Sequence, residues 1–455
     1  MVINKRWSNF LFKEVSISPL IAFRIIIGIL FLFSTVRFIL NGWVKQLYID
    51  PPFHFSYLGF DWVKPLAGNG MYLPFIAMIV ASLGIIFGAF YRFSTSLFFL
   101  AFTYVELLDK SYYLNHYYFV SLIAFLLIWM PANAQFSLDA KRNPSIQRET
   151  IPQWPIFLLR FQLGIVYCFA GIAKLNADWL FEAQPLRLWL QAFRDLPLVG
   201  NLFATSWVAF GFSWFSCFYD LTIPFFLSKN KTRVVAYVFV VVFHVITWLL
   251  FPIGVFPWVM ICSTLIFFPA SFHDRWLNKL KNWFRWKSVS AKISSPASKT
   301  VFIFTSIFLI IQIILPFRYL LYPNGLFWHE EGFRFSWRVM LVEKKGYATF
   351  YVEDPKTRNS IEISNEDYLS PQQIDQMSRQ PDMILQFAHF LGNKYADTTF
   401  HFGSKSVHLS RPRVTADVYV TLNGRPNQHF VGRETDLMKE HYNLKHRKWI
   451  IPLKN

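Results

Sequence analysis

Long apolar runs separated by short polar segments dominate the first two thirds of the chain. A helix needs about 20 mostly apolar residues to cross the hydrocarbon core of a bilayer. Nine runs approach or reach that length: Pro19–Leu40, Leu73–Phe90, Ser94–Leu108, Tyr117–Met130, Trp154–Leu175, Phe203–Leu227, Val234–Phe251, Val255–Pro269 and Thr300–Leu320. The third, fourth and eighth are short enough to be buried or re-entrant instead. The pattern predicts a multi-pass α-helical membrane protein of about nine spans, with eight as the alternative.

The pattern changes after Leu321, where the strands and helices of a soluble α+β domain are expected. The predicted elements are strands at Tyr347–Val352 and Ser360–Ile363, helical periodicity over Gln372–Tyr395 broken at Pro381, and a hairpin of Val418–Leu422 and His429–Val431 around Asn423-Gly424. Asn-Gly between two such strands is a strong hairpin signal. We therefore expect residues 1–321 to form a transmembrane helical domain and residues 322–455 to form a β-rich extracytoplasmic domain.

Composition and charge support this division. Apolar residues make up 54% of the 455 residues and charged residues 16%, whereas soluble globular proteins contain about 45–50% and about 25%. Residues 1–321 hold 27 Lys and Arg and 12 Asp and Glu, against 18 and 15 in residues 322–455. The basic residues of the first part lie in short clusters between apolar runs, which is typical of membrane topology and not of a nucleic-acid surface. The composition argues against a disordered chain and against an ordinary soluble enzyme.

The distribution of Lys and Arg predicts the orientation in the membrane. With nine spans and a cytoplasmic N-terminus, 17 basic residues lie in cytoplasmic segments and 7 lie outside or at an outer boundary. Cytoplasmic loops carry the excess of basic residues, so the C-terminal domain is expected outside the cytoplasm. The basic stretch from His273 to Lys299 is a linker or a surface-lying helix, because its apolar residues share one face. Cys168, Cys217 and Cys262 fall within predicted spans, so no exported disulfide is expected.

The densest group of polar residues inside a predicted span is Arg160, Tyr167 and Lys174. They lie seven residues apart, which is almost two helical turns, so they share one face of the helix. Ionisable residues inside a membrane are costly and therefore mark functional candidates. Lys174 is expected at the outer end of this helix. It either extends to the interface or, being desolvated, acts as a base.

Two histidines form the next candidates. Asn115-His116 lies at the outer end between two short spans, and His244 lies about two turns from the outer end of its own span. A lone intramembrane histidine is more often a packing residue, but Lys174, His116 and His244 all border the side of the C-terminal domain. Other ionisable or polar residues in these spans are expected to balance local charge or to pack: Glu106 with Lys110, Asp220, Gln312 and Arg24.

Several familiar chemistries have no motif in this chain. The sequence contains no Walker-type phosphate loop, no His-Glu-x-x-His and no Gly-x-Ser-x-Gly. Three cysteines in 455 residues exclude a disulfide scaffold and a multi-cysteine zinc site. No metal cofactor and no nucleic-acid partner are expected.

One run of residues resembles a known family. Arg160-Phe-Gln162 followed by Ala170-Gly-Ile-Ala-Lys174-Leu-Asn-Ala-Asp178-Trp179 is similar to vitamin K-dependent gamma-carboxylase and the related horizontally transferred transmembrane (HTTM) family. Further stretches resemble it in the same order: Asn115-His116-Tyr117-Tyr118, Phe243-His244, Ile253-Gly254-Val255-Phe256-Pro257-Trp258-Val259-Met260, Gln312-Ile313-Ile314-Leu315-Pro316, Phe335-Ser336-Trp337-Arg338-Val339-Met340 and the hairpin of residues 414–432. The resemblance covers most of the chain.

The resemblance implies an enzyme that oxidises a reduced vitamin K-type hydroquinone with dioxygen to its epoxide and uses the strong base so formed to carboxylate a protein glutamate with carbon dioxide. It implies that Lys174 deprotonates the hydroquinone and that His116 and His244 serve the same active site. Asn115, Arg160, Tyr167 and Gln312 are then candidates for binding the quinol. The expected partners are the membrane quinone and a protein or peptide glutamate on the extracytoplasmic side.

The chain departs from the animal members that it resembles. They have a Lys-Lys pair where this chain has Ala173-Lys174, and Asp where Asn176 stands. They join their membrane and lumenal parts by a disulfide, and they extend further at the C-terminus. Two other functions stay open: a quinol epoxidase or oxidase of the same fold without carboxylation, and a transporter or binding protein with a Lys/His proton relay. The transporter would favour broken helices in inverted halves, and the sequence contains no such symmetry.

Overall fold

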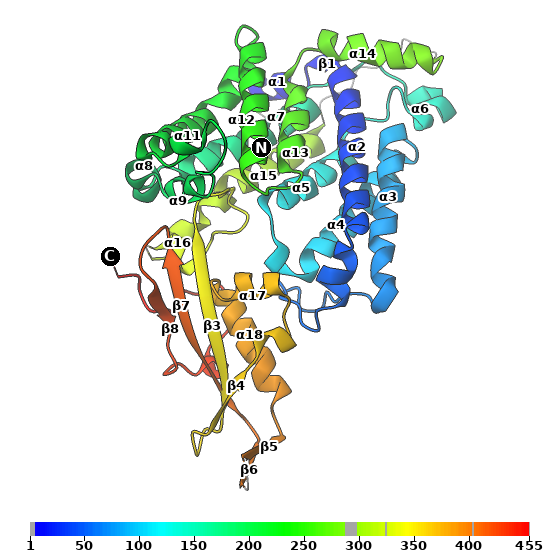
Figure 1. Cartoon of the computed structure of the whole chain (residues 1–455). Coiled ribbons are helices and arrows are strands. Elements are labelled where there is room, and N and C mark those ends of the chain that lie inside the picture. Colours follow the sequence, from blue (N-terminus) through cyan, green and yellow to red (C-terminus); the bar gives the residue numbers. More distant parts are fainter. Residues whose placement is uncertain (1–4, 287–297, 324, 403–404, 455) are drawn as a thin grey trace.

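A bundle of helices carries a smaller part that contains most of the strands (Figure 1). The computed structural model describes residues 5–286, 298–323, 325–402 and 405–454. The bundle is made of α1 Lys5–Leu11, α2 Ser18–Leu40, α3 Tyr72–Phe87, α4 Tyr91–Leu108, α5 Asn115–Trp129, α6 Leu138–Arg142, α7 Trp154–Ala173, α8 Ala177–Glu182, α9 Leu186–Gln191, α10 Gly200–Phe203, α11 Ser206–Ser228, α12 Arg233–Leu250, α13 Phe256–Thr264, α14 Ala270–Trp283 and α15 Lys299–Ile314, with a short ribbon of β1 Glu14–Ser16 and β2 Thr150–Pro152.

Five helical segments of the described residues are long and apolar enough to cross a membrane, which makes this an integral membrane protein. They are Ser18–Leu40, Gly68–Phe87, Trp154–Ala173, Arg233–Leu250 and Lys299–Leu321. A sixth is added if the pair Phe256–Phe267 and Ala270–Trp283, which is bent by 108°, counts as one span. Each of the nine predicted runs forms a helix. However, α4, α5 and α11 are not among the segments that are both long enough and apolar enough to cross a membrane. The number of nine spans therefore stays a prediction.

Local signals in the sequence explain where the long helices begin and turn. Proline stands in the first turn of α2 and of α7, where its missing N–H costs no hydrogen bond. Gly88 ends α3 in the left-handed conformation, with φ of 59°. The Asp139 carboxylate accepts the N–H groups of Phe90 and Tyr91 at 2.7 and 2.8 Å and so caps α4. These contacts fix the tight antiparallel pair of α3 and α4.

The side chain of the buried Arg24 of α2 binds the backbone of a loop. Its guanidinium donates to the carbonyl oxygens of Ala132 at 2.8 Å and Phe136 at 2.6 Å. Backbone carbonyl oxygens thus accept from both terminal nitrogens of this buried arginine. The packing role expected for Arg24 thus takes the form of a polar anchor between α2 and the loop before α6.

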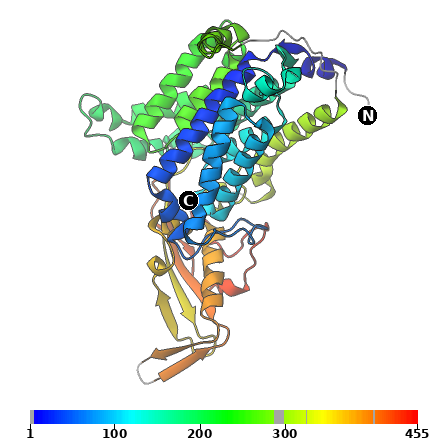
Figure 2. The same cartoon turned by 90° about the vertical axis from the view of Figure 1, so that its right-hand side faces the viewer.

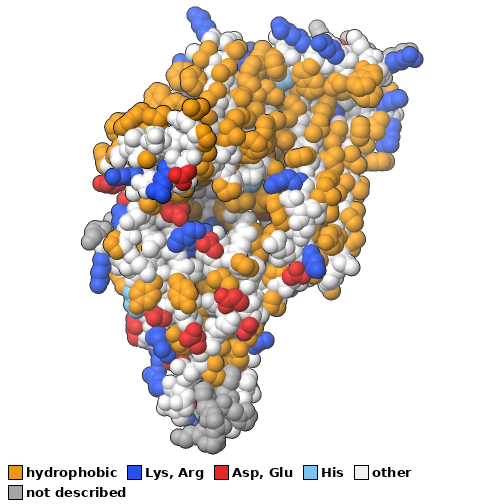
Figure 3. Space-filling model, in the orientation of Figure 1, with side chains coloured by type: hydrophobic (Ala, Val, Ile, Leu, Met, Phe, Trp, Pro, Cys, Tyr) orange, Lys and Arg blue, Asp and Glu red, His pale blue; other side chains and the backbone are white. Residues whose placement is uncertain are grey.

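Helix α14 crosses the end of the bundle (Figure 1). It buries Leu277 and leaves Arg275, Lys279 and Trp283 exposed. This mixture of exposed basic and aromatic residues is typical of helices in the membrane interface. The surface-lying helix expected from His273 onward is present as far as Trp283, and residues 287–297 of the predicted segment lie outside the described residues. Figure 3 shows apolar side chains covering the visible face of the bundle, with Lys and Arg gathered at the edge near α14.

The smaller part is an antiparallel sheet of four strands with two helices against one face (Figures 1 and 2). The strand order is β4-β3-β7-β8, and the elements are β3 Lys344–Glu353, β4 Ser360–Ile363, β7 Arg413–Leu422, β8 Gln428–Val431, α16 Leu326–His329, α17 Pro371–Met377 and α18 Pro381–Lys394. All four predicted strands, the break of the helix at Pro381 and the Asn423-Gly424 turn are confirmed, and both turn residues have positive φ. The sequence did not predict the ribbon of β5 Thr398–Phe402 and β6 Lys405–Leu409.

A buried ion cluster joins the two parts near α4. Lys110 Nζ lies 2.9 Å from Asp382 Oδ2 of α18, and Arg334 reaches the same carboxylate at 2.7 Å. The local pair of Glu106 with Lys110 expected from their i,i+4 spacing is therefore wrong, because Lys110 turns toward the second part. Burial alone would raise the pKa of Asp382, but Arg334 and Lys110 outweigh it and hold that pKa well below its usual range.

A second polar contact joins the parts at the Asn423-Gly424 turn. Asp178, which follows α7, accepts both arms of the Arg425 guanidinium at 2.6 and 2.8 Å and the Asn423 amide at 2.7 Å. Bidentate pairs of this kind fix orientation as well as distance. The three cysteines are free and all lie in the bundle, in α7, α11 and α13, so no disulfide joins the two parts. Asp178 and Arg425 thus provide a noncovalent link between the two parts.

Candidate active site

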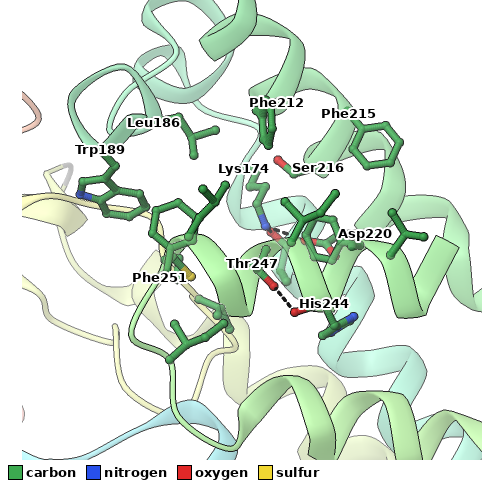
Figure 4. A pocket seen from close by; sticks show the side chains of 18 of the residues that line it. Lys174, Leu186, Trp189, Phe212, Phe215, Ser216, Asp220, His244, Thr247 and Phe251 are labelled. Atoms are coloured by element: carbon green, nitrogen blue, oxygen red, sulfur yellow. Dashed lines mark hydrogen bonds and ion pairs between the residues drawn. The ribbon is translucent and has the colours of Figure 1, made fainter. Parts of the chain in front are cut away.

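A cavity of about 590 Å³ lies between α7, α11 and α12, at the end of the bundle that faces the second part. Its walls are mostly aromatic and aliphatic, with Leu186 and Trp189 of α9 on one side and Phe256 of α13 on another. Val339 and Met340, from the segment that leads into β3, also line it. Pockets of this size suit a ligand of a few rings. The apolar walls bind such a ligand, and the few polar groups among them fix its orientation. Figure 4 shows the labelled side chains that surround the space.

Lys174 enters this cavity at the end of α7. The helix ends at Ala173, and the Asn176 side chain then accepts the N–H of Trp179 at 3.0 Å to begin α8. Lys174 is only 5% exposed. Its Nζ lies 2.5 Å from Asp220 Oδ2 and 5.3 Å from the centre of the Trp179 ring. Of the two alternatives for Lys174, this burial fits the desolvated lysine and not a side chain that extends to the membrane interface.

The ion pair depends on how closely α7 and α11 approach. A Cβ atom on Gly171 would lie 2.7 Å from Leu221 Cγ and 2.9 Å from the Leu221 backbone nitrogen. Carbon atoms in normal contact are about 3.5–4.0 Å apart. Only glycine fits here without displacing α11. Leu221 directly follows Asp220, so this contact sets the distance between Lys174 and its carboxylate.

His244 and Tyr167 complete the polar lining of one side. His244 is 2% exposed, and its Nδ1 lies 2.9 Å from the carbonyl oxygen of Val240. Because a carbonyl only accepts, Nδ1 carries the proton, and a neutral ring then has Nε2 as its acceptor. The rings of Tyr167 and His244 meet edge to face with centroids 6.1 Å apart. Three of the expected residues, Lys174, Tyr167 and His244, thus line one cavity.

The other expected residues lie elsewhere in the bundle. His116 lines a second cavity of about 430 Å³ between α2, α4, α5 and α13. The Phe256 ring separates the two spaces, with its centroid 5.6 Å from that of His116 and 5.9 Å from that of His244. Asn115 donates to the carbonyl oxygen of Arg338 at 2.9 Å, so it holds the segment that leads into β3.

Gln312 and Arg160 also contact backbone and aromatic groups away from the first cavity. Gln312 of α15 is buried beside Tyr118. Arg160 donates from Nε to the carbonyl oxygen of Ile266 at 3.0 Å and from a terminal nitrogen to that of Phe267 at 3.3 Å. It therefore ties α7 to the turn after α13. Its position 14 residues before Lys174 puts it about 21 Å away along the helix.

Asp220 is the residue that sequence reasoning missed. It was expected to pack, yet it lines the cavity and pairs with Lys174 across 46 positions of the chain. The signal was present, since an acidic residue inside an apolar run needs a partner of opposite charge. Its partner could not be chosen from the sequence, because the contact depends on which helices are neighbours.

Comparison with known proteins gives two matches that together cover almost the whole chain. The family model described as HTTM domain matches residues 12–272. The model described as vitamin K-dependent gamma-carboxylase, lumenal domain, matches residues 297–455. No solved structure matches the chain.

Proposed function

Because the chain belongs to the HTTM domain family and its remainder matches the lumenal domain of vitamin K-dependent gamma-carboxylase, we propose that it is a quinol-driven glutamyl carboxylase. Its substrates would be a reduced vitamin K-type hydroquinone, dioxygen, carbon dioxide and the glutamate of a protein or peptide. The observation that carries the proposal is the buried Lys174 in a largely apolar cavity of about 590 Å³. An apolar wall fits the ring system of such a quinol, and its hydroxyl group needs a base.

The quinol, when bound, supplies the driving force, since its oxidation by dioxygen to the epoxide generates the strong base that removes a γ-proton from glutamate. Lys174 would take the proton of the quinol hydroxyl. The aromatic side chains of Trp189, Phe212 and Phe251 would exclude water, which strengthens every charge interaction in the cavity. Tyr167 would lie beside the bound ring.

The histidines would serve the later steps. Negative charge develops as the glutamate loses its proton. Nδ1–H of His244 is donated to Val240, so the ring would stabilise that charge through Nε2 after Nε2 has taken up a proton. A single donor of this kind contributes about 2.7–4 kcal/mol to a transition state in a dry site. His116 would support the site from the far side of the Phe256 ring, which it contacts with centroids 5.6 Å apart. Replacing either histidine should then lower carboxylation more than epoxidation.

The two parts would meet their substrates from different directions. The apolar surface of the bundle supports delivery of the quinone through lipid. The match to a lumenal domain supports an extracytoplasmic position for residues 322–455, with the N-terminus in the cytoplasm. Val339 and Met340 line the cavity from that side, so a protein glutamate would approach along them.

The decisive experiment supplies purified protein with hydroquinone, a glutamate-containing peptide and labelled bicarbonate. Epoxide and peptide-bound label are both measured. Formation of both supports the carboxylase. Epoxide without label identifies a quinol epoxidase, and the absence of both products contradicts the proposal. Lys174→Ala is the matched negative control, because it removes the amine and leaves the rest of the cavity in place.

A further inference from the structure

We propose that Asp220 completes the base by taking a proton from Lys174 as Lys174 takes the proton of the quinol. The inference rests on the proposed function and adds a residue that the resemblance did not assign. Asp220 acts through Lys174, so it is a positioning residue and the proton acceptor for the lysine. Figure 4 shows the two side chains pointing toward each other inside the cavity.

The geometry places the two groups in one hydrogen bond. Lys174 Nζ and Asp220 Oδ2 are 2.5 Å apart, and each side chain is 7% exposed. The other hydrogen-bond contact of Nζ is the carbonyl oxygen of Ala170 at 3.5 Å. The contact is an ion pair between the Lys174 ammonium and the Asp220 carboxylate. An ammonium has three donors and no acceptor, so it cannot take a proton until it gives one away.

Asp220 is the group within reach that can receive that proton. The titratable side chains near the pair, among the described residues, are Cys168 and Tyr167 of α7, Cys217 and Tyr219 of α11 and His244 of α12, and the Trp179 ring of α8 lies beside Nζ. Of these, the thiols and phenols carry their own protons at neutral pH. His244 faces the same cavity and has Nε2 as an acceptor, but Lys174 Nζ makes its hydrogen bonds to Asp220 and Ala170 and not to this ring.

The relay balances atoms and charge. The quinol O–H bond breaks and an N–H bond forms on Lys174. One of the other N–H bonds of Lys174 breaks, and an O–H bond forms on Asp220. Before the step the site holds an ammonium, a carboxylate and a neutral quinol, and after it an ammonium, a carboxylic acid and a quinolate. The net charge is zero throughout, which matters because an uncompensated charge in a dry cavity is expensive.

The competing interpretation treats Asp220 as a counter-ion only. Lys174 would then have to lose its proton to solvent before each turnover. In the wild type the epoxidation rate would rise about tenfold per pH unit through the neutral range, because the paired ammonium is the inactive form. Under the relay the pair is active as it stands. The rate should then be level from about pH 6.5 to pH 8.5 and fall only where the carboxylate takes up a proton from solvent.

The Asp220→Asn substitution separates the two interpretations by the direction of a shift. If Asp220 is only a counter-ion, its loss lets burial favour the neutral amine of Lys174. The acid limb of the pH profile, which is the range where the epoxidation rate falls toward acid, then moves to lower pH. The epoxidation rate at neutral pH rises. If Asp220 is the proton acceptor, the lone amine must bind and release the proton by itself. A lone amine takes up a proton more readily than a carboxylate beside an ammonium, so the acid limb moves to higher pH.

The experiment measures epoxide formed per folded molecule in the full-length protein between about pH 5.5 and pH 9. Thr222→Val is the matched control, because Thr222 lies on the same helix and its hydroxyl donates to the backbone carbonyl oxygen of Phe218 at 2.7 Å. Asp220→Glu should return the acid limb of the epoxidation profile to its wild-type pH. A limb that moves to lower pH in Asp220→Asn, or one that Asp220→Glu fails to restore, overturns the inference.

The wild-type profile decides the matter if Asp220→Asn does not fold. A level rate through neutral pH supports the relay, and a tenfold rise per pH unit overturns it. Failure of this inference is distinct from failure of the proposed function. If no epoxide forms at any pH, both the proposed function and the relay are refuted. If epoxide forms but the wild-type rate rises tenfold per pH unit, or the acid limb of Asp220→Asn moves to lower pH, only the relay is refuted.

Discussion

The close contact at Gly171 allows a direct test of how α7 and α11 set the distance within the ion pair. In Gly171→Ala the new Cβ would lie 2.9 Å from the backbone nitrogen of Leu221. The Leu221 side chain can rotate away, but its backbone moves only with α11. Relief of the contact to ordinary separation requires the helices to move apart by roughly 0.5–1 Å.

The size of the effect follows from that displacement. Overpacking of this kind costs about 1–3 kcal/mol, and the gain in helix propensity from glycine to alanine returns about 0.5–1 kcal/mol. The net loss of stability should be on the order of 1 kcal/mol. The 2.5 Å contact between Lys174 and Asp220 would lengthen to about the limit of a good hydrogen bond. Misplacement by about 1 Å can cost a hundredfold in rate, so epoxidation should fall about 10- to 100-fold.

Gly164→Ala is the matched control on the same helix, seven residues earlier and facing the same neighbour. There the new Cβ would meet Pro224 Cβ at 3.9 Å, an ordinary contact. We expect this variant to keep the wild-type rate and melting temperature or to gain slightly in stability. The assay is epoxide formed per folded molecule, with melting followed in detergent. If the two alanine variants have the same rate and melt at the same temperature, the contact at Gly171 does not control the ion pair.

Three further outcomes are expected. Lys174→Ala and Lys174→Arg should both abolish epoxide formation while the protein still folds, because a guanidinium does not release its proton; near-normal turnover in either contradicts the assignment. A reporter fused to the C-terminus should work only as an exported enzyme, and activity of a cytoplasmic reporter there refutes the orientation. Asp178→Asn should weaken docking of the second part, seen as a lower melting temperature. Hydrogen bonds from Arg425 lower the pKa of Asp178, so this stabilisation is present above its unfolded pKa of about 3.9 and is lost as pH falls through the folded value. The melting difference between wild type and Asp178→Asn should therefore vanish in acid, and a constant difference down to about pH 3 would contradict it.

The sequence predicted the elements of the second part better than the layout of the bundle. Strand patterns, the proline at 381 and the Asn423-Gly424 turn are local signals, and they gave the main strands and both helices of this part. The apolar runs of the bundle also gave helices in the right places. They could not give the number of spans, because a short apolar helix such as α5 is equally compatible with burial in protein and with exposure to lipid.

The candidate site was predictable only in part for a similar reason. Helical spacing placed Tyr167 and Lys174 on one face, and both line the cavity. The same spacing could not place Asp220, since its partner comes from another helix and the approach depends on Gly171. Nor could it separate His116 from His244, because the Phe256 ring that lies between them belongs to a third helix. Contacts between helices depend on packing that periodicity within one helix does not encode.

The presence of Val339 and Met340 in the cavity wall has a consequence for how such a protein can be divided. These two residues belong to the region that matches the lumenal domain, yet they face a space built mainly by the helices of the HTTM region. A chain truncated after the helices would leave that wall open to water. The two regions therefore form a single module in which the second completes the chamber of the first. Under the proposed function, exchanging lumenal domains between relatives would alter the shape of the quinol site as well as the choice of protein substrate.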